Sequence, residues 1–342
     1  MRSVLAVQNR NAGIDVARAV ALVGMMIAHL TYLDGLAVQV FYGFPAALFA
    51  FISGVSMGYM RGRPAQFIVR GLCLIGMHFA LAPFTGHVFV VLGTIGLCMA
   101  LLAWAPRWSS PVLLWLACAL AFGSAVLATG SVVLIAAFWP YSPVTWATLL
   151  VAGILFQRHM IAPRRLALGL VVGTALFVAN LALRWYVPLP GFFDASGHTG
   201  GLGDVVGSIG TSVGICSLCC LLQRWIRWLT PLGRMPLTVY CIHVLSADWL
   251  APKWFGIWVS LAGAIVISYV WLAVFERGPI ETLLRRITAV VGKEKHEEIR
   301  NERHRRSDRG RSAQRLPCRC AAEHDFRGGR RGGQAGRLRA RR

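Results

Sequence analysis

Apolar residues recur in long runs between residues 14 and 275, and polar residues fall mainly in the short gaps between those runs. A helix that crosses a bilayer needs about 20 mostly apolar residues. Ten segments approach or reach that length and predict membrane helices, at 13–33, 36–60, 66–83, 87–105, 111–130, 142–157, 166–187, 204–223, 235–251 and 254–275. The apolar segment 131–140 is left open, as an extension of the fifth helix or as an interfacial stretch.

The composition agrees with this pattern. The 342 residues are 56% hydrophobic and 14% charged, whereas a soluble domain carries roughly 25% charged residues. We therefore expect an all-α fold, a polytopic membrane bundle of about ten transmembrane helices formed by residues 1–291, with the lipid bilayer as its main partner.

The orientation of the bundle follows from its arginines, because Lys and Arg are enriched in cytoplasmic loops. If the N-terminus is cytoplasmic, the inner segments collect fifteen arginines between Arg2 and Arg286, and the outer segments hold only Arg184 and Lys253. The sequence thus predicts both ends inside, in the plasma (cytoplasmic) membrane.

Residues 292–342 differ from the rest of the chain. They hold 17 Lys and Arg against 7 Asp and Glu, with few apolar residues. A segment of this kind buries too little apolar surface to offset the entropy of ordering it. We expect a disordered basic cytoplasmic tail that lies beside anionic lipid, and no binding of nucleic acid.

The first predicted helix carries three ionisable residues, Asp15, Arg18 and His29. At about 100° per residue, Arg18 and His29 lie about 20° apart around the helix, and Asp15 is about 40° from His29. A charge inside the bilayer costs about 2.5–3.5 kcal/mol on insertion scales, so this polar face should meet other helices or a cavity. A purely structural pair between Asp15 and Arg18 is an equally good interpretation of those two residues.

Three further histidines and a pair of cysteines lie in or beside the predicted helices. His243 lies near the middle of the ninth predicted helix, with Tyr240 on the same face, and His198 lies in the outer loop before the eighth. His78 is better explained by packing. The Cys-x-x-Cys at Cys216 and Cys219 lies in an apolar helix, where thiols behave as small hydrophobes, so no metal site is predicted. Nucleotide-binding, zinc-protease and Gly-x-Ser-x-Gly motifs are missing from the sequence.

Several stretches resemble known membrane families. The run Gly13-Ile-Asp-Val-Ala-Arg18 through His29 resembles the first helix of the transmembrane acyltransferase superfamily, with the R-x10-H spacing of its acyltransferase-3 members. The segments 46–54 (Ala-Ala-Leu-Phe-Ala-Phe-Ile-Ser-Gly), 197–200 (Gly-His-Thr-Gly), 233–243 and 278–286 are similar to bacterial heparan-α-glucosaminide N-acetyltransferase-like and DUF418 proteins. The resemblance covers about residues 10–288.

The resemblance implies transfer of an acyl group, often acetyl from acetyl-CoA, to a sugar, glycolipid or small polar acceptor. His29 would then serve as base or nucleophile, Arg18 and Arg70 would bind the donor, and Asp15 would orient Arg18. His243, Tyr240 and His198 would be secondary partners. Acetyl-CoA would be a co-substrate, and no resident cofactor is expected.

Two other functions stay open at this stage. The polar face could line the pathway of a transporter or permease, because intramembrane polar residues mark such pathways equally well. The chain could also be a non-catalytic membrane protein of the same fold. The acceptor, a covalent acyl-histidine as against direct transfer, and homo-oligomer formation are likewise undecided.

Overall fold

The computed structural model describes residues 11–60, 63–86, 88–130, 140–251 and 253–290, which form helices and no strand. Seven helical segments among them are long and apolar enough to cross a membrane. They are α1 (Ala12–Leu30), α2 (Gly35–Phe41) with α3 (Phe44–Tyr59), α4 (Pro64–Leu81) with a 3-10 turn (Ala82–Phe84), α6 (Ser110–Thr129), α8 (Pro163–Tyr186), α9 (Leu202–Leu222) and α12 (Gly256–Val274).

Shorter helices occupy the three remaining predicted segments. They are α5 (Leu92–Leu101), α7 (Pro143–His159) and α11 (Pro236–Leu250), the last preceded by α10 (Thr230–Arg234). Short 3-10 turns lie at Ala105–Arg107, Gly191–Phe193 and Arg227–Leu229, and residues 279–290 are helical. The all-α prediction is confirmed, with seven rather than ten helices meeting the length and hydropathy expected of a membrane span. The predicted tail 292–342 and residues 131–139 lie outside the described residues.

The second predicted span is interrupted. Gly43 separates α2 from α3 with φ +102°, a backbone conformation that favours glycine. A Cβ built on Gly43 would lie 2.9 Å from the Cα of Gly197, so the outer loop also packs against this turn. The predicted segment 36–60 corresponds to one apolar candidate span, Gly35–Tyr59. Its helix is interrupted where Gly43 is followed by Pro45 in the first turn of α3.

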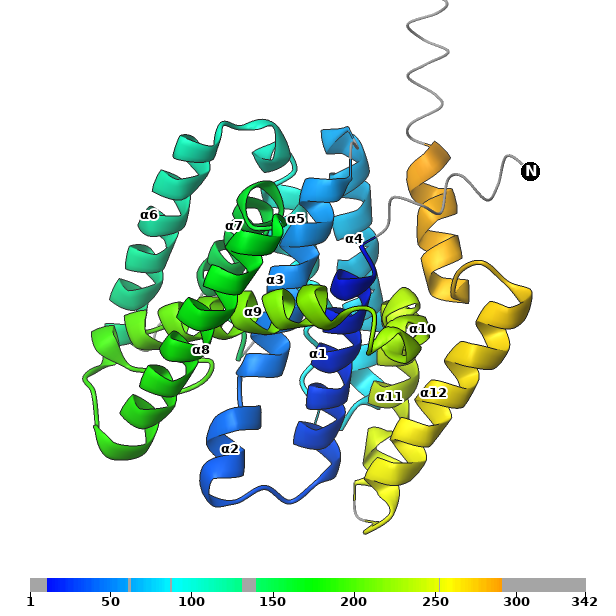
Figure 1. Cartoon of the computed structure of the whole chain (residues 1–342). Helices are drawn as coiled ribbons and strands as arrows, with labels where there is room; N and C mark the ends of the chain where they lie inside the picture. Colours follow the sequence, from blue (N-terminus) through cyan, green and yellow to red (C-terminus); the bar gives the residue numbers. More distant parts are fainter. Residues whose placement is uncertain (1–10, 61–62, 87, 131–139, 252, 291–342) are drawn as a thin grey trace, which may run out of the picture. The chain divides into compact units, whose positions relative to one another are not determined.

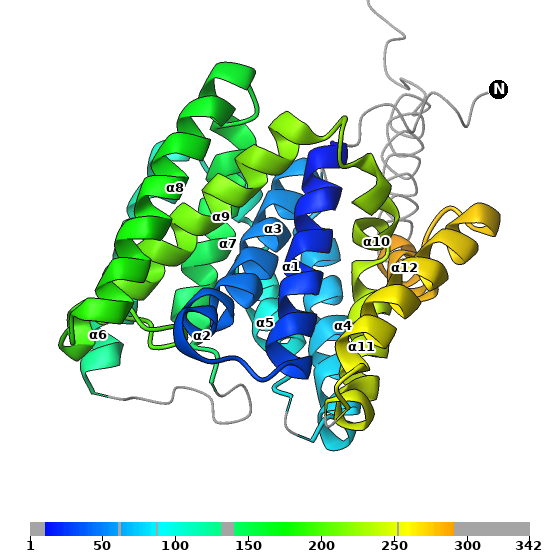
Figure 2. The same cartoon turned by 60° about the horizontal axis from the view of Figure 1, so that its bottom comes forward.

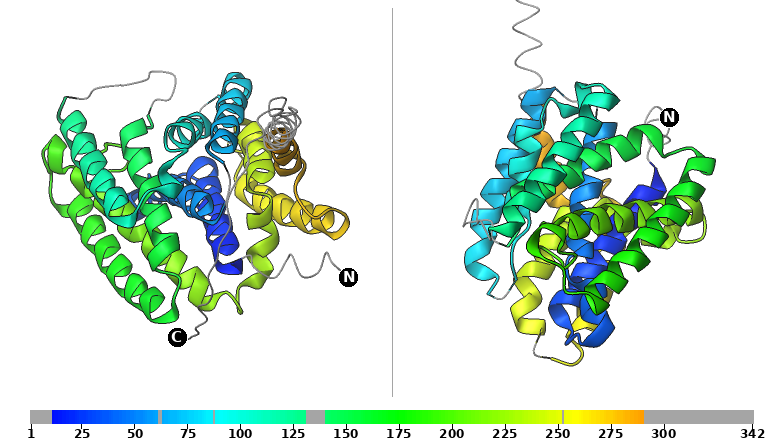
Figure 3. Two further views of the ribbon diagram at one scale, coloured as in Figure 1. Left: turned by 90° about the horizontal axis from the view of Figure 1, so that it is seen from above. Right: turned by 90° about the vertical axis from the view of Figure 1, so that its left-hand side faces the viewer.

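Figure 1 shows α1 and α3 inside the bundle, with α6–α8 on one side and α11–α12 on the other. Figure 2 and the view from above in Figure 3 give the same order. The burial of the helices agrees with this order, since most residues of α1 and α9 are buried whereas less than a quarter of those of α6, α8 and α12 are. Exposed apolar residues such as Trp115 and Val270 suit contact with lipid chains better than with water.

Glycines set the close crossing of α3 and α7. A Cβ on Gly54 would overlap the carbonyl oxygen of Leu150, and a Cβ on Gly153 would overlap that of Phe51. Small residues let helix backbones approach closely in membranes, so Gly54 and Gly153 permit this close crossing.

The close crossing of α3 and α7 should make the protein sensitive to a larger residue at Gly54. We expect Gly54→Ala to destabilise the protein by about 1–3 kcal/mol, because backbone atoms of α7 leave no room for a methyl group. The control is Gly76→Ala on α4, where no atom lies within 4 Å of an added Cβ and alanine should gain about 0.8–1 kcal/mol of helix propensity. Unfolding in mixed micelles measures both. Equal stability of the two variants would contradict the tight crossing.

Candidate functional site at the histidine pair

Two histidines from distant parts of the chain meet inside the bundle. His29 Nδ1, in the last turn of α1, lies 3.0 Å from His243 Nε2, in the middle of α11. Their rings are parallel, with centroids 5.3 Å apart. His243 is 2% exposed, while His29 is half-buried. A neutral imidazole has one donor and one acceptor nitrogen, so at this distance one ring fixes the tautomer of the other.

The end segment of the membrane domain anchors α11. The Glu281 carboxylate accepts hydrogen bonds from the backbone N–H groups of Leu237 and Thr238, at 2.7 and 3.2 Å, and from the Thr238 hydroxyl at 2.7 Å. It therefore caps the N-terminus of α11, where backbone N–H groups lack partners within the helix. This gives the 278–286 stretch a physical role, because it fixes the helix that carries His243.

A close contact fixes α10, just before α11, against α1. A Cβ on Gly233 would overlap the backbone carbonyl of Asp15. Gly233 thus holds α10 at the beginning of α1, and His243 meets His29 at its end. Helices α1 and α11 therefore run side by side in the same direction (Figure 1), which brings His29 and His243 to the same level of the bundle.

Arg18 lies nearer the start of α1, on the same face. Its guanidinium donates a hydrogen bond to the carboxylate of Asp15 and a second, of 2.8 Å, to the Ser56 hydroxyl on α3. The Ser56 hydroxyl in turn donates to the Ile52 carbonyl at 2.7 Å. The predicted pairing of Asp15 with Arg18 is present, and Ser56 is a partner that the sequence did not indicate.

Arg70 lies on α4, close enough to Arg18 and Glu281 for both charges to act on it. The two predicted donor-binding residues, Arg18 and Arg70, thus share one region of the bundle with Glu281, the residue that caps α11. This region lies toward the beginning of α1, and the histidine pair lies toward its end. Their separation of eleven residues along α1 corresponds to about 16 Å.

Tyr240 and His78 have packing roles. The hydroxyl of Tyr240 accepts a hydrogen bond of 3.0 Å from the backbone N–H of Val91, immediately before α5, and its ring stacks on Phe49. His78 Nδ1 lies 3.0 Å from the Val90 carbonyl oxygen. Both side chains thus fasten the segment that leads into α5, as predicted for His78.

His198 lies in the loop between α8 and α9, with φ +66°. Its ring makes edge contacts with Tyr42 and Tyr141, with centroids 5.0 and 5.2 Å apart. Burial lowers the pKa of His198 to about 4, and the charges of Arg184 and His29 act in the same direction. His198 is therefore neutral at pH 7.

Sequence reasoning missed the pair formed by Arg184 and Asp204. Their side chains are 1% and 4% exposed and lie 3.3 Å apart. Arg184 also donates to the carbonyls of Ala195, Gln39 and Tyr42, at 2.6, 2.9 and 3.0 Å. It thereby ties α2 and the outer loop to α8 and α9. The sequence signal for this pair was the position of Arg184 near the end of one predicted helix and of Asp204 at the beginning of the next.

Metal binding finds no support among the described residues, where no group of three or more His, Cys, Asp or Glu side chains could hold an ion. Cys216 and Cys219 are buried free thiols on α9.

A small apolar cavity of about 180 Å³ lies between α11 and α12 and is bordered by His243 and Ser246. His243 thus adjoins a space that could receive a small apolar group.

These features define a multi-pass helical membrane protein with a histidine pair enclosed by its helices. The family model described as "Protein of unknown function (DUF418)" matches residues 154–291 and supports the DUF418 part of the resemblance. The matched region contains His198, Tyr240, His243 and Glu281, whereas His29 lies outside it. A search of curated proteins finds no match.

Proposed function

We propose that this protein is an integral membrane acyltransferase that moves acetyl from cytoplasmic acetyl-CoA to a sugar or other polar acceptor at the extracytoplasmic face. The observation that carries the proposal is the 3.0 Å approach of His29 Nδ1 to His243 Nε2 within the bundle. A reactive group within hydrogen-bonding distance of a base is the arrangement used in nucleophilic and general-base catalysis.

In the proposed reaction, His29 removes the proton from an acceptor hydroxyl as that oxygen attacks the thioester carbon. The C–S bond breaks, and the thiolate of CoA takes the proton from the imidazolium. His243 acts as a positioning residue that fixes the tautomer of His29. The half-buried state of His29 favours it as the ring that meets substrate, since His243 is almost fully buried.

The donor would enter from the side of Arg18 and Arg70. We propose the topology predicted from the arginines, with ten spans and both ends of the membrane domain on the cytoplasmic side of the plasma membrane. Arg70 and the remaining N–H groups of Arg18 would then face the CoA phosphates, because guanidinium groups form strong charge-assisted hydrogen bonds with phosphate. The charge of Asp15 keeps Arg18 oriented across this region.

The test supplies radiolabelled acetyl-CoA to purified protein in sealed proteoliposomes, sorted by orientation. We expect incorporation into added acceptors only where the cytoplasmic face is accessible to the donor. His29→Ala should reduce the rate by about 10²–10⁴-fold, the usual contribution of an acid–base group. The matched control is His159→Ala, which removes an exposed histidine whose Nε2 lies 2.8 Å from the Ser110 hydroxyl and should retain wild-type activity.

Distinct results would refute distinct parts of the proposal. Full activity of a folded His29→Ala variant would remove the catalytic assignment. Activity with donor confined to the opposite face would overturn the topology. If the folded wild-type protein neither binds CoA nor transfers acetyl, a transporter or a non-catalytic membrane protein becomes the better explanation.

A further inference from the structure

A second, larger cavity lies on the other side of α1 from the histidine pair. It has a volume of about 520 Å³ and lies between α1, α3, α8, α9 and α12, within the range of about 300–1,000 Å³ typical of ligand sites. On α1 it is lined by Val20, Val23, Gly24 and Ile27, which lie about 120–180° around the helix from His29. It is therefore separate from the proposed catalytic site.

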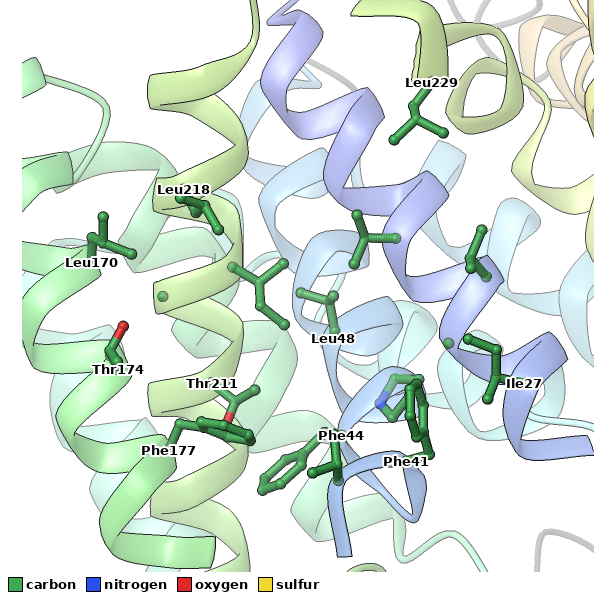
Figure 4. Close-up of a pocket in the computed structure, with 18 of the residues that line it drawn as sticks. Ile27, Phe41, Phe44, Leu48, Leu170, Thr174, Phe177, Thr211, Leu218 and Leu229 are labelled. Atoms are coloured by element: carbon green, nitrogen blue, oxygen red, sulfur yellow. The ribbon is translucent and has the colours of Figure 1, made fainter. Parts of the chain in front are cut away.

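The cavity extends along the bundle. Figure 4 shows Leu229 toward one end, and Phe41 and Phe44 toward the other. Its α9 lining runs from Thr211 to Leu218, which corresponds to about 10 Å along the helix axis. This length accommodates part of an acyl chain.

Contacts at both ends explain why side chains leave this space open. A Cβ on Gly13 would overlap Cys220, so α1 and α9 converge at the beginning of α1. At the opposite end, the guanidinium of Arg184 lies 4.0 Å from the centroid of the Phe44 ring. Between these contacts the helices separate, and the cavity occupies the gap.

The lining selects an apolar occupant. Among the described residues, no charged side chain lines the cavity, and the polar ones are Thr174, Trp228 and Thr211. The hydroxyl of Thr211 is already used in a hydrogen bond of 2.7 Å to the Gly207 carbonyl. A polar solute would lose most of its hydration there for few replacement hydrogen bonds. The floor includes Leu48, which is 1% exposed, and the rim includes Leu218 at 40% and Trp228 at 56%. The cavity is thus open at its rim, among helices that suit the hydrocarbon region.

Charge at one end indicates the headgroup. The 3-10 turn Arg227–Leu229 supplies Trp228 and Leu229 to the lining. Arg227 is exposed directly beside them, and the exposed Arg224 lies over the Trp225 ring at 4.9 Å. Exposed tryptophans with arginines are typical of a membrane–water interface, and such arginines attract anionic lipid headgroups.

We propose that this cavity binds one acyl chain of an anionic glycerophospholipid, whose phosphate lies beside Arg224 and Arg227. The acyl chain displaces no water that is held by hydrogen bonds to the lining, and it fills the gap between α1 and α9. The site goes beyond the acyl-transfer proposal and does not depend on it.

The test uses the full chain in nanodiscs of phosphatidylcholine. A trace of phosphatidylglycerol carrying a photoreactive diazirine on its acyl chain is the probe, and crosslinked peptides are identified by mass spectrometry. We expect enriched labelling of the lining on α1, α8 and α9 over the exposed face of α12. Excess unlabelled phosphatidylglycerol should suppress the lining label and leave the α12 label largely unchanged.

Two sets of variants test the two parts of the proposal. Leu218→Trp blocks the rim and should reduce the lining label about tenfold, equivalent to excluding about two methylene groups. Leu221→Trp, at a similarly exposed position of α9 outside the lining, should change it less than about twofold. Arg224→Gln and Arg227→Gln should each reduce the preference for phosphatidylglycerol over phosphatidylcholine about fivefold.

The proposal is overturned if the lining is labelled no more than the α12 face, which would indicate general lipid contact. A phosphatidylcholine probe with the same diazirine chain measures the headgroup preference, and equal labelling of the wild type by the two probes would overturn the headgroup assignment. If Leu218→Trp does not fold, competition by unlabelled lipid in the wild-type protein decides the question alone. Failure of competition there would equally refute the site.

Discussion

Arg184→Met should lower the free energy of unfolding by about 3–5 kcal/mol, the usual result of removing one member of a buried ion pair. The substitution leaves the Asp204 carboxylate without its cation in a site that excludes water. It also removes the donor for the carbonyls of Gln39, Tyr42 and Ala195. A charged group without a partner is more costly in the membrane than in water, which places this among the largest effects expected in the protein.

Denaturation in mixed micelles, followed by circular dichroism, measures this effect. Arg164→Met, at an exposed position in the first turn of α8, is the control and should change stability by less than about 0.5 kcal/mol. The double variant Arg184→Met with Asp204→Leu should recover much of the loss, because replacing a whole buried pair by apolar groups is often neutral. If the single variant and the control are equally stable, the ion pair does not hold the outer loop.

The helices were the most predictable part of the fold. Their apolar runs reflect the bilayer, which requires a minimum length and satisfies backbone groups only within helices. The apolar pattern did not show the break between α2 and α3, because Gly43 and Pro45 lie within an apolar run. Their helix-breaking geometry marks the turn locally. The packing of Gly197 against this turn joins it to a loop far along the chain and has no sequence signature.

Part of the candidate site was also visible in the sequence. A polar face on an otherwise apolar helix singles out Asp15, Arg18 and His29 because each is costly in the bilayer. His243 stood out for the same reason, but its contact with His29 joins α1 to α11 and has no sequence signature. Tyr240 shares the face of His243, and the sequence could not show that its hydroxyl is engaged by Val91.

The role of Glu281 was hidden for a related reason. In the sequence it is one acidic residue in a polar segment after the last span. In the structure it caps α11 through the backbone of Leu237 and Thr238. Helix capping by a residue more than forty positions away leaves no periodic pattern, so only the fold reveals that this segment supports the histidine pair.

His29 and His243 are expected to act together in catalysis. If His29 and His243 act as one unit, His243→Ala should slow acyl transfer by about 10²–10⁴-fold, as much as His29→Ala. The double variant should be no slower than either single variant, because groups that act together are not additive. His243→Gln should restore part of the rate, since its amide oxygen can accept a hydrogen bond from His29 Nδ1–H in place of the imidazole and so leave His29 Nε2 free to take a proton.

Initial rates with labelled acetyl-CoA, measured from pH 5.5 to 8.5, distinguish this from a packing role for His243. A positioning partner shifts the pH dependence of the rate, because it changes the basicity of His29. A packing residue would leave the pH profile of the remaining activity unchanged. Multiplicative losses in the double variant, together with an unshifted profile in His243→Gln, would show that His29 acts without its neighbour.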